Sequence, residues 1–200
     1  MLVAGYEFTR AAESLLNKDG ALALAMTKSA RNGTPEEIAR VKRTFFATTR
    51  TYLGRRLLQS DRNANLMIEV LRTCVAQHEF HLHDFVVMPD HVHLLVTPDG
   101  RMTIEKAMQL IKGRFSYRLK RELGYLGEVW QRGFSEVSVC GEQSFRAHRE
   151  YIAQDPVRAG LMKSSEEYPY CFASLSKKRQ AKDGVLVQKS CDCGTSNLEP

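Results

Sequence analysis

The chain has 200 residues, of which 43% are hydrophobic and 26% charged. This composition is ordinary for a globular protein of one domain with extensions, or of two small domains, and its core needs no disulfide framework. Lys and Arg exceed Asp and Glu, which leaves a formal net charge of +6. That excess favours a polyanionic partner, most often nucleic acid, although a basic surface without a partner is the alternative.

Three regions are predicted along the chain. Residues 1–40 read as an N-terminal extension that is partly helical, because the Thr-Pro-Glu-Glu sequence at 34–37 makes a good helix start. Residues 41–175 form the main domain. Residues 176–200 lack periodicity, and we expect them to be a disordered tail.

Within the main domain, the apolar pattern alternates between the periods of strands and helices. The expected elements are a strand at 45–52, a helix at 61–77, strands at 81–88 and 91–97, a helix that Thr103 caps, a strand at 129–139 and a helix at 143–154. Pro89-Asp90 makes the turn of a hairpin, and Pro156 is expected to end the last helix. This order indicates an α+β fold in which helices cover one face of an antiparallel sheet.

Two histidines stand one residue apart in the apolar run VVMPDHVHLLV at 86–96. Side chains at i and i+2 share one face of a strand, so His91 and His93 are neighbours there. Two imidazoles at this separation can bind one divalent ion, each through a single nitrogen. The alternative is a pair of hydrogen-bonded histidines without a metal.

A second pair with the same spacing, His81 and His83, opens the preceding strand. Solvated histidines are common where a strand begins. His93, in contrast, continues into an apolar run that would hold ligands rigidly. We therefore favour His91 and His93 as the metal ligands.

A third ligand and a nucleophile are predicted from HREYIAQDP at 148–156. Tyr151 and Asp155 are four residues apart and share one face of a helix. The Asp155 carboxylate suits Mg²⁺ or Mn²⁺. A phenol is a weak nucleophile until a base or a neighbouring cation helps it to lose its proton. Taken alone, a tyrosine such as Tyr151 is more often a buried packing residue than a nucleophile.

The helix that Thr103 caps has a basic outer face, formed by Lys106, Lys112, Arg114, Arg118, Lys120 and Arg121. Such residues neutralise phosphates and make affinity sensitive to salt, although they could also be a solvated face. Further candidates for DNA contact are Arg50, Arg55, Arg56, Arg132 and Arg158. Arg158 could instead cap the helix of Tyr151, and Trp130 could stack on a base or belong to the core.

Cysteines and apolar runs indicate where the chain acts. The five cysteines are scattered, which favours reduced thiols in the cytoplasm over disulfides. The Cys191–Cys193 pair lacks the further ligands that would indicate zinc. No signal peptide is recognisable, and the apolar run at 21–26 is too short to span a bilayer, so we expect no membrane partner.

These motifs together resemble the single-tyrosine HUH transposases, and in particular the REP-associated tyrosine transposases, also called transposase IS200-like proteins. The likeness rests on MPDHVHLLV at 88–96, WQRGF at 130–134 and YIAQDPVRAG at 151–160, and it covers about residues 43–175. An HxH pair alone is weak, but the three motifs in this order are strong together.

The resemblance implies a ferredoxin-like α+β core with the HUH pair on a central strand. It implies a metal-dependent enzyme that nicks and rejoins single-stranded DNA beside hairpin-forming repeats, through a covalent 5′-phosphotyrosine. By position, Tyr151 is the nucleophile, and His91, His93 and Asp155 hold Mg²⁺ or Mn²⁺. Relatives usually carry Asn or Gln at the third ligand, so Asp155 adds a negative charge near the phosphate. A bacterial cytoplasmic location, at the nucleoid, is expected.

Several alternatives remain open from the sequence. Tyr117 and Tyr125 are rival nucleophiles. The chain could be a retired transposase that binds repeat hairpins without cutting them. A histidine-motif nucleotide hydrolase would need HxHxH, and residue 95 is Leu. Relatives include swapped-helix dimers and apparent monomers, so the oligomeric state is undecided.

Overall fold

The structure is a computed structural model that describes residues 43–77, 79–100, 102–163 and 168–176. The predicted extension at 1–40 and nearly all of the predicted tail at 176–200 lie outside these residues. Within them, no helix is both long and apolar enough to cross a bilayer.

Four antiparallel strands form one sheet, in the order β2-β3-β1-β4. They are β1 (Thr44–Arg50), β2 (Phe80–Val87), β3 (His91–Pro98) and β4 (Ser135–Val139). β2 and β3 make the predicted hairpin, and β3 lies between β2 and β1. The HxH pair is therefore on a central strand of an antiparallel α+β sheet, as predicted.

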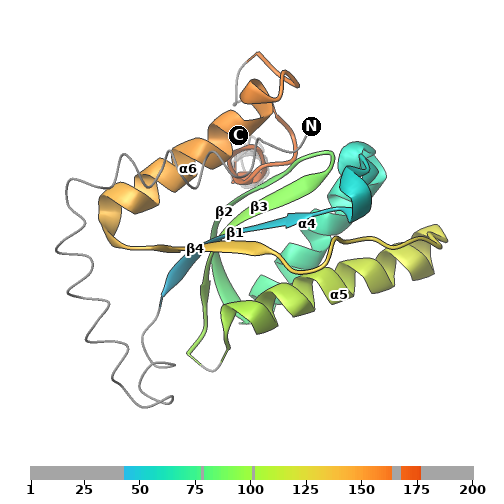
Figure 1. The fold of residues 1–200 in the computed structure, drawn as a ribbon, viewed down its shortest axis with the longest axis horizontal. Coiled ribbons are helices and arrows are strands. Elements are labelled where there is room, and N and C mark those ends of the chain that lie inside the picture. The colour runs from blue at the N-terminus through green and yellow to red at the C-terminus, as the bar shows by residue number, and fades with distance from the viewer. Residues whose placement is uncertain (1–42, 78, 101, 164–167, 177–200) are drawn as a thin grey trace, which may run out of the picture. The chain divides into compact units, whose positions relative to one another are not determined.

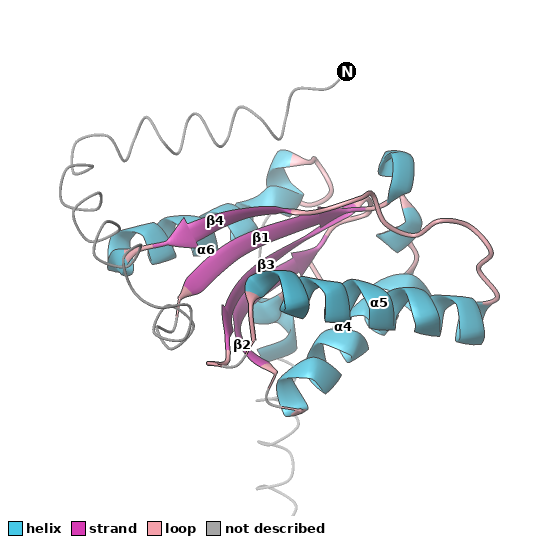
Figure 2. Cartoon of the chain, turned by 60° about the horizontal axis from the view of Figure 1, so that its bottom comes forward, coloured by secondary structure: helices cyan, strands magenta, loops and turns pink. Residues whose placement is uncertain are grey.

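Helices cover both faces of this sheet, so the expectation of a single covered face is wrong. Helices α4 (Asp61–Ala76) and α5 (Ile104–Leu123) lie on one side of it, and α6 (Gly141–Arg158) lies on the other (Figures 1 and 2). The reason is visible in β3, where apolar residues occupy both faces. Leu94 packs into the cluster of α4 and α5, whereas Leu95 packs into the cluster that includes Ile152 of α6. A strand buried on both faces needs cover on both.

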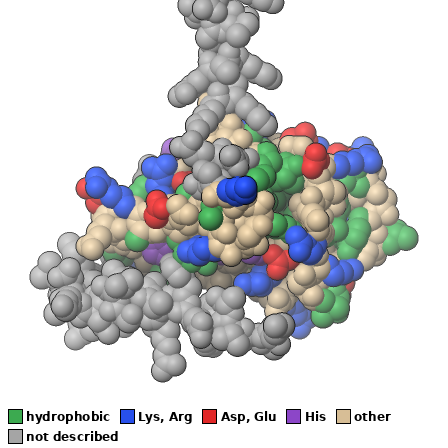
Figure 3. All heavy atoms as spheres, turned by 90° about the horizontal axis from the view of Figure 1, so that it is seen from above, with side chains coloured by type: hydrophobic (Ala, Val, Ile, Leu, Met, Phe, Trp, Pro, Cys, Tyr) green, Lys and Arg blue, Asp and Glu red, His purple; other side chains and the backbone are tan. Residues whose placement is uncertain are grey.

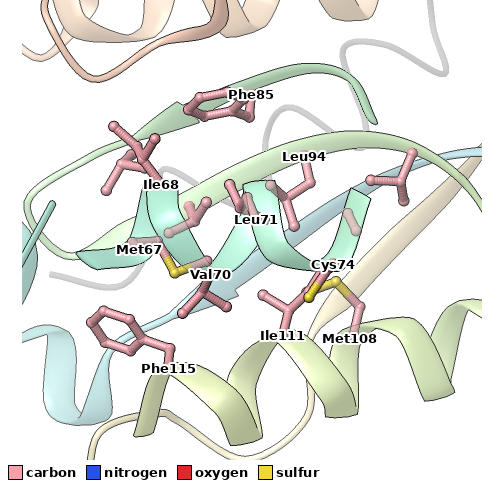
Figure 4. Close-up of a cluster of buried hydrophobic side chains, with 14 of the residues drawn as sticks. Met67, Ile68, Val70, Leu71, Cys74, Phe85, Leu94, Met108, Ile111 and Phe115 are labelled. Atoms are coloured by element: carbon pink, nitrogen blue, oxygen red, sulfur yellow. The ribbon is translucent and has the colours of Figure 1, made fainter. Parts of the chain in front are cut away.

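The larger core lies between the sheet, α4 and α5 (Figure 4). Its centre includes the fully buried side chains of Met67, Leu71, Met108, Ile111 and Phe115. These residues recur at helical spacing along α4 and α5, and the match between pattern and burial is what places both helices on the sheet.

Helix ends follow local chemistry. The Thr103 hydroxyl accepts a hydrogen bond from the backbone N–H of Lys106, as the predicted N-cap should. At α4, the Ser60 hydroxyl accepts a hydrogen bond from the backbone N–H of Asn63, and Asp61 lies in the first turn. Gly124 ends α5 in the left-handed conformation, with φ 65°.

The predicted strand at 129–139 is interrupted, because β4 covers only its second half, and its first half joins the sheet through a single bridge between Trp130 and Thr51. Between this bridge and β4, side chains make further bonds. Lys112 Nζ donates to the carbonyl oxygens of Gln131 and Gly133, and the indole of Trp130 donates to the carbonyl of Lys112. The Trp130 ring packs on Phe115 with centroids 5.3 Å apart, so Trp130 takes the core alternative.

Helix α6 continues through Pro156 to Arg158, so the prediction that Pro156 ends it is wrong. The bias of a residue before proline against the helical region is a tendency that tertiary packing can override. Here both Asp155 and Pro156 are buried, and the Ala159 N–H donates to the Asp155 carbonyl at 2.9 Å. The extra turn places Arg158 beside Tyr151 and Asp155.

Candidate metal centre and nucleophile

Two imidazoles and one carboxylate converge between β3 and α6. His91 Nε2 lies 3.1 Å, and His93 Nε2 3.5 Å, from the same oxygen, Oδ2 of Asp155. One donor atom from each residue lies within 4.8 Å of the other two. Among the residues that the structure describes, no other three His, Cys, Asp or Glu side chains gather in this way. The sequence prediction of this trio is thus matched by its geometry.

The far nitrogen of each imidazole has a partner of its own. His91 Nδ1 lies 2.7 Å from Asp90 Oδ1, and His93 Nδ1 lies 2.7 Å from Thr48 Oγ1. When Nδ1 of a histidine donates to such a partner, Nε2 keeps its lone pair for a metal. A donor set of two imidazoles and a carboxylate oxygen fits a divalent ion.

Sequence reasoning missed Asp90 and Thr48 as supports of the two imidazoles. Asp90 precedes His91 directly, and a carboxylate next to a candidate ligand was a usable signal. Thr48 had no such signal, because it meets His93 only across the pairing of β1 with β3.

The charges of the trio are strongly coupled. Burial lowers the pKa of His91, but hydrogen bonds to Asp155 and Asp90 outweigh it, and the net pKa is raised. Burial, helped by His91, lowers the pKa of His93 to about 3, so its imidazole is neutral. Burial alone would raise the pKa of Asp155, yet the histidines and Arg158 lower it. His93 is therefore neutral and Asp155 ionised, as metal ligands must be, whereas the raised pKa of His91 means that a metal competes there with a proton.

Tyr151 lies beside this trio on α6. Its ring stands edge-on to His93, with centroids 5.4 Å apart, and edge-on to Phe46 at 5.7 Å. The guanidinium carbon of Arg158 is 3.8 Å from the ring centroid, and Arg158 also donates to the Tyr151 carbonyl at 2.9 Å. The phenol is therefore held between an arginine and the HxH strand.

The surroundings of Tyr151 resist its ionisation. Burial and the charge of Asp155 raise the pKa of the phenol, whereas Arg158 and Arg50 act in the opposite direction. An additional cation at the trio would act in the same sense as the two arginines, since an opposite charge nearby favours the phenolate.

Phe46 links these groups and was also missed from the sequence. Its ring stacks on His93 with centroids 5.1 Å apart and packs against His148 at 4.9 Å. The sequence gives no signal that Phe46 contacts His93 and His148, because these contacts depend on how α6 crosses β1.

The rival residues lie elsewhere. His81 is exposed, and His83 Nε2 is hydrogen-bonded to Thr97 Oγ1 at 2.7 Å. Tyr117 is exposed on α5, which covers the opposite face of the sheet from α6 (Figure 1). Tyr125 lies in the loop after α5, against Arg55.

Several of the residues predicted to contact DNA already have protein partners. Arg114 forms a bidentate pair with Glu79, with both N···O distances 2.9 Å. Arg118 pairs with Glu122 at 2.6 Å, and Lys112 donates to loop carbonyls. The basic face that the sequence indicates along α5 is thus partly neutralised within the protein.

The remaining basic candidates are exposed side chains on separate elements, namely Lys120 and Arg121 on α5, Arg55 and Arg56 after β1, Arg132 before β4, and Arg158 at the end of α6. Arg158 is the member of this set that touches the candidate site, through Tyr151 and Asp155. The role of each in DNA binding stays a prediction.

The antiparallel sheet with the HxH pair on a central strand is the fold expected from the resemblance to single-tyrosine HUH transposases, and the trio lies beside a helical tyrosine. The profile of the family Transposase IS200 like matches residues 48–155, more than half of the chain, and the chain belongs to that family. The matched range includes Tyr151 and all three residues of the trio.

Known proteins of this family resemble the chain at modest identity. It is 28% identical over 92 residues to the REP-associated tyrosine transposase of Escherichia coli (strain K12), which covers 46% of this chain and 53% of the relative. It is 25% identical over 109 residues to a putative REP-associated tyrosine transposase of Haemophilus influenzae, which covers 50% of this chain and 61% of the relative. The match thus spans little more than half the length of these curated relatives.

A solved structure shows the same fold. The structure of a REP-associated tyrosine transposase bound to a REP hairpin matches with a TM-score of 0.54 and 26% identity, over 72% of this chain and 83% of the other. The predicted family and fold class are confirmed.

Proposed function

We propose that this chain is a metal-dependent single-stranded DNA endonuclease and strand transferase that acts at hairpin-forming repeats. The observation that carries the proposal is the convergence of His91, His93 and Asp155 beside Tyr151, since the four side chains supply a metal site and a nucleophile together. The DNA substrate is inferred from the family and from the relative that was solved with a REP hairpin. Action on chromosomal repeats fits a bacterial cytoplasmic protein at the nucleoid.

In the proposed reaction, the Oη atom of Tyr151 attacks the phosphorus of a phosphodiester. A bond forms between Oη and phosphorus, the bond from phosphorus to the 3′ oxygen breaks, and the phenol proton ends on that oxygen as a free 3′ hydroxyl. The 5′ side of the break stays on the enzyme as a phosphotyrosine ester. Because one phosphodiester replaces another, a 3′ hydroxyl can reverse the step and rejoin the strand without ATP.

His91, His93 and Asp155 would hold Mg²⁺ or Mn²⁺, which when bound polarises a phosphoryl oxygen. Asp90 and Thr48 keep the two imidazoles turned toward the site. Arg158 keeps the phenol in place, and its charge favours the phenolate.

The alternative is a protein that binds repeat hairpins without cutting them. The trio and Tyr151 are all present, and their supporting contacts are intact, which disfavours a loss of chemistry. The two functions differ in a single observable, which is a covalent DNA–protein adduct.

The test uses labelled hairpin oligonucleotides with single-stranded flanks, taken from repeats beside the gene. Each is incubated with the protein in Mn²⁺ or in EDTA and resolved on a denaturing gel. We expect an adduct that needs Mn²⁺ and is lost in Tyr151→Phe. Tyr117→Phe is the matched control, because it removes an exposed phenol from the far face of the sheet, and it should form the adduct as the wild type does.

The possible outcomes distinguish the proposed nicking enzyme from a protein that only binds the hairpins. An adduct that survives Tyr151→Phe would move the nucleophile to another tyrosine. Binding of the hairpins without an adduct on any repeat, in the presence of Mn²⁺, would favour the protein that binds without cutting.

A further inference from the structure

Leu53 has an unusual conformation and an unusual exposure. It lies in η1 (Tyr52–Gly54) with φ 56° and ψ 24°, and it is the one described residue other than glycine with a positive φ. A bulky residue in this region costs on the order of 1–3 kcal/mol, a cost that tends to be retained at functional sites. Its side chain is 78% exposed, so packing does not explain why leucine is there.

The turn that carries Leu53 is fixed to the metal-site end of β3. The Thr51 N–H donates to the carbonyl of Asp90 at 2.9 Å, and the Thr51 hydroxyl donates to the same oxygen at 3.0 Å. Asp90 in turn contacts the imidazole of His91. Leu53 therefore lies two residues after Thr51, which is hydrogen-bonded to the residue that precedes His91.

A second exposed leucine lies on a loop that is tied to this turn. Leu126 is 97% exposed in the loop between α5 and β4. The Arg55 guanidinium lies 5.2 Å from the ring centroid of Tyr52 and 5.9 Å from that of Tyr125, and it donates to the carbonyl of Glu128. This arginine clasp connects the Leu53 turn with the Leu126 loop.

Gly127 shows how closely the two loops approach. A Cβ atom at this position would lie 2.9 Å from Tyr125 Oη and 3.3 Å from Arg55 Nη1. The residue next to Leu126 is thus a glycine at a close approach, where a side chain would have to displace the ends of the Tyr125 and Arg55 side chains. The clasp therefore joins the segment that carries Leu53 to the segment that carries Leu126.

We propose that Leu53 and Leu126 form a contact for an unpaired DNA base beside the metal site, with Arg55 and Arg56 near its phosphates. The proposal rests on the proposed function and names the part of the substrate that this end of the molecule recognises. Apolar wedges such as leucine pack between or against bases, and nearby arginines neutralise the backbone.

A nucleic acid fits these loops better than a protein partner does. Two isolated leucines among arginines are far less than the roughly 800 Å² per partner that a stable protein interface buries. Figure 3 shows Lys and Arg side chains scattered among hydrophobic ones on the face seen from above, and close to Leu53 in the chain Arg55 and Arg56 are both exposed. Mixed basic and apolar groups of this kind suit bases and phosphates together.

Leu53→Gly is the decisive variant, because we expect it to keep or raise the stability of the fold while it lowers the affinity for DNA. Glycine adopts a positive φ without strain, so we expect the melting temperature to be unchanged or higher. We expect affinity for a hairpin with a single-stranded flank to fall roughly fivefold to tenfold, the low end of the effect of losing one base contact. Leu126→Ser, at an almost fully exposed position, should act in the same direction.

Binding is measured by fluorescence anisotropy in EDTA, which prevents cleavage, and 2-aminopurine in the flank reports which base is contacted. Val75→Ala is the control variant, since Val75 is an exposed apolar residue in the last turn of α4. A blunt hairpin is the control DNA. Val75→Ala should bind as the wild type does, and the blunt hairpin should bind all variants equally.

Wild-type affinity of both leucine variants for the flanked hairpin would overturn the inference, and so would an equal loss on the blunt hairpin. Because binding is read without cleavage, the two proposals fail separately. Suppose that the wild-type protein forms no adduct, and that Leu53→Gly binds the flanked hairpin more weakly than the wild type does. That pair of results would refute nicking and support the base contact.

Discussion

Asp155→Ala tests the metal centre directly, through the effect of Mn²⁺ on stability. Asp155 is the one anionic member of the trio, and both histidine Nε2 atoms lie within 3.5 Å of its Oδ2. An ion that binds the folded chain at 100 times its Kd adds about 2.7 kcal/mol to the free energy of unfolding. For a chain of this size, that raises the melting temperature by roughly 5–11 °C.

The variant should lose most of this gain. If removal of the carboxylate weakens binding about a hundredfold, the same Mn²⁺ concentration equals the new Kd and adds only about 0.4 kcal/mol. The assay is thermal unfolding with EDTA and with increasing Mn²⁺, so that the direct cost of the substitution is measured in EDTA and subtracted.

His81→Ala is the matched control, because it removes an exposed histidine from the rival HxH pair. We expect it to keep the full Mn²⁺ shift. The reasoning is refuted if Mn²⁺ stabilises Asp155→Ala as much as the wild type, or if the shift disappears in His81→Ala instead.

Three further predictions follow from the same contacts. Asp90→Ala removes the partner of His91 Nδ1 and should weaken Mn²⁺ binding about 10- to 100-fold in a calorimetric titration. Phe46→Leu keeps an apolar side chain but loses the ring against His93, so we expect adduct formation to slow roughly tenfold or more while the cost in stability stays below about 1.5 kcal/mol. Burial raises the pKa of Tyr168 from 10.0 to about 12, so the folded chain keeps this phenol protonated where the unfolded chain ionises. The contribution of this phenol to stability should therefore be constant below pH 10 and be lost between pH 10 and 12, and urea unfolding of Tyr168→Phe should show a shallower fall over that range.

Much of the fold was predictable because its signals are local. Strand and helix periods indicated the elements, Pro89-Asp90 indicated the hairpin turn, and Thr103 indicated a helix cap. Local signals gave a wrong prediction where contacts between distant residues determined the backbone conformation. At 129–134, the continuous strand ladder is reduced to a single bridge between Trp130 and Thr51, and side-chain bonds of Lys112 and Trp130 are added to it.

The candidate site divides in the same way. The i, i+2 spacing on a strand was enough to place His91 and His93 on one face, and the i, i+4 spacing on a helix was enough to pair Tyr151 with Asp155. Spacing within one element cannot show that two elements meet. Residue chemistry proposed Asp155 as the third ligand, and the resemblance to a family supported it, but only the structure shows that the two elements meet.

The sequence by itself determined the class of fold and the family, and it singled out the residues that we propose to bind a metal and attack a phosphate, because each of these inferences depends on residue type and short spacing. The tertiary structure decided which face α6 covers and that the helix runs through Pro156 to bring Arg158 against Tyr151. It also decided that Arg114 and Arg118 form ion pairs with carboxylates within the protein. These outcomes depend on packing and pairing between residues far apart in the chain, which no local pattern records.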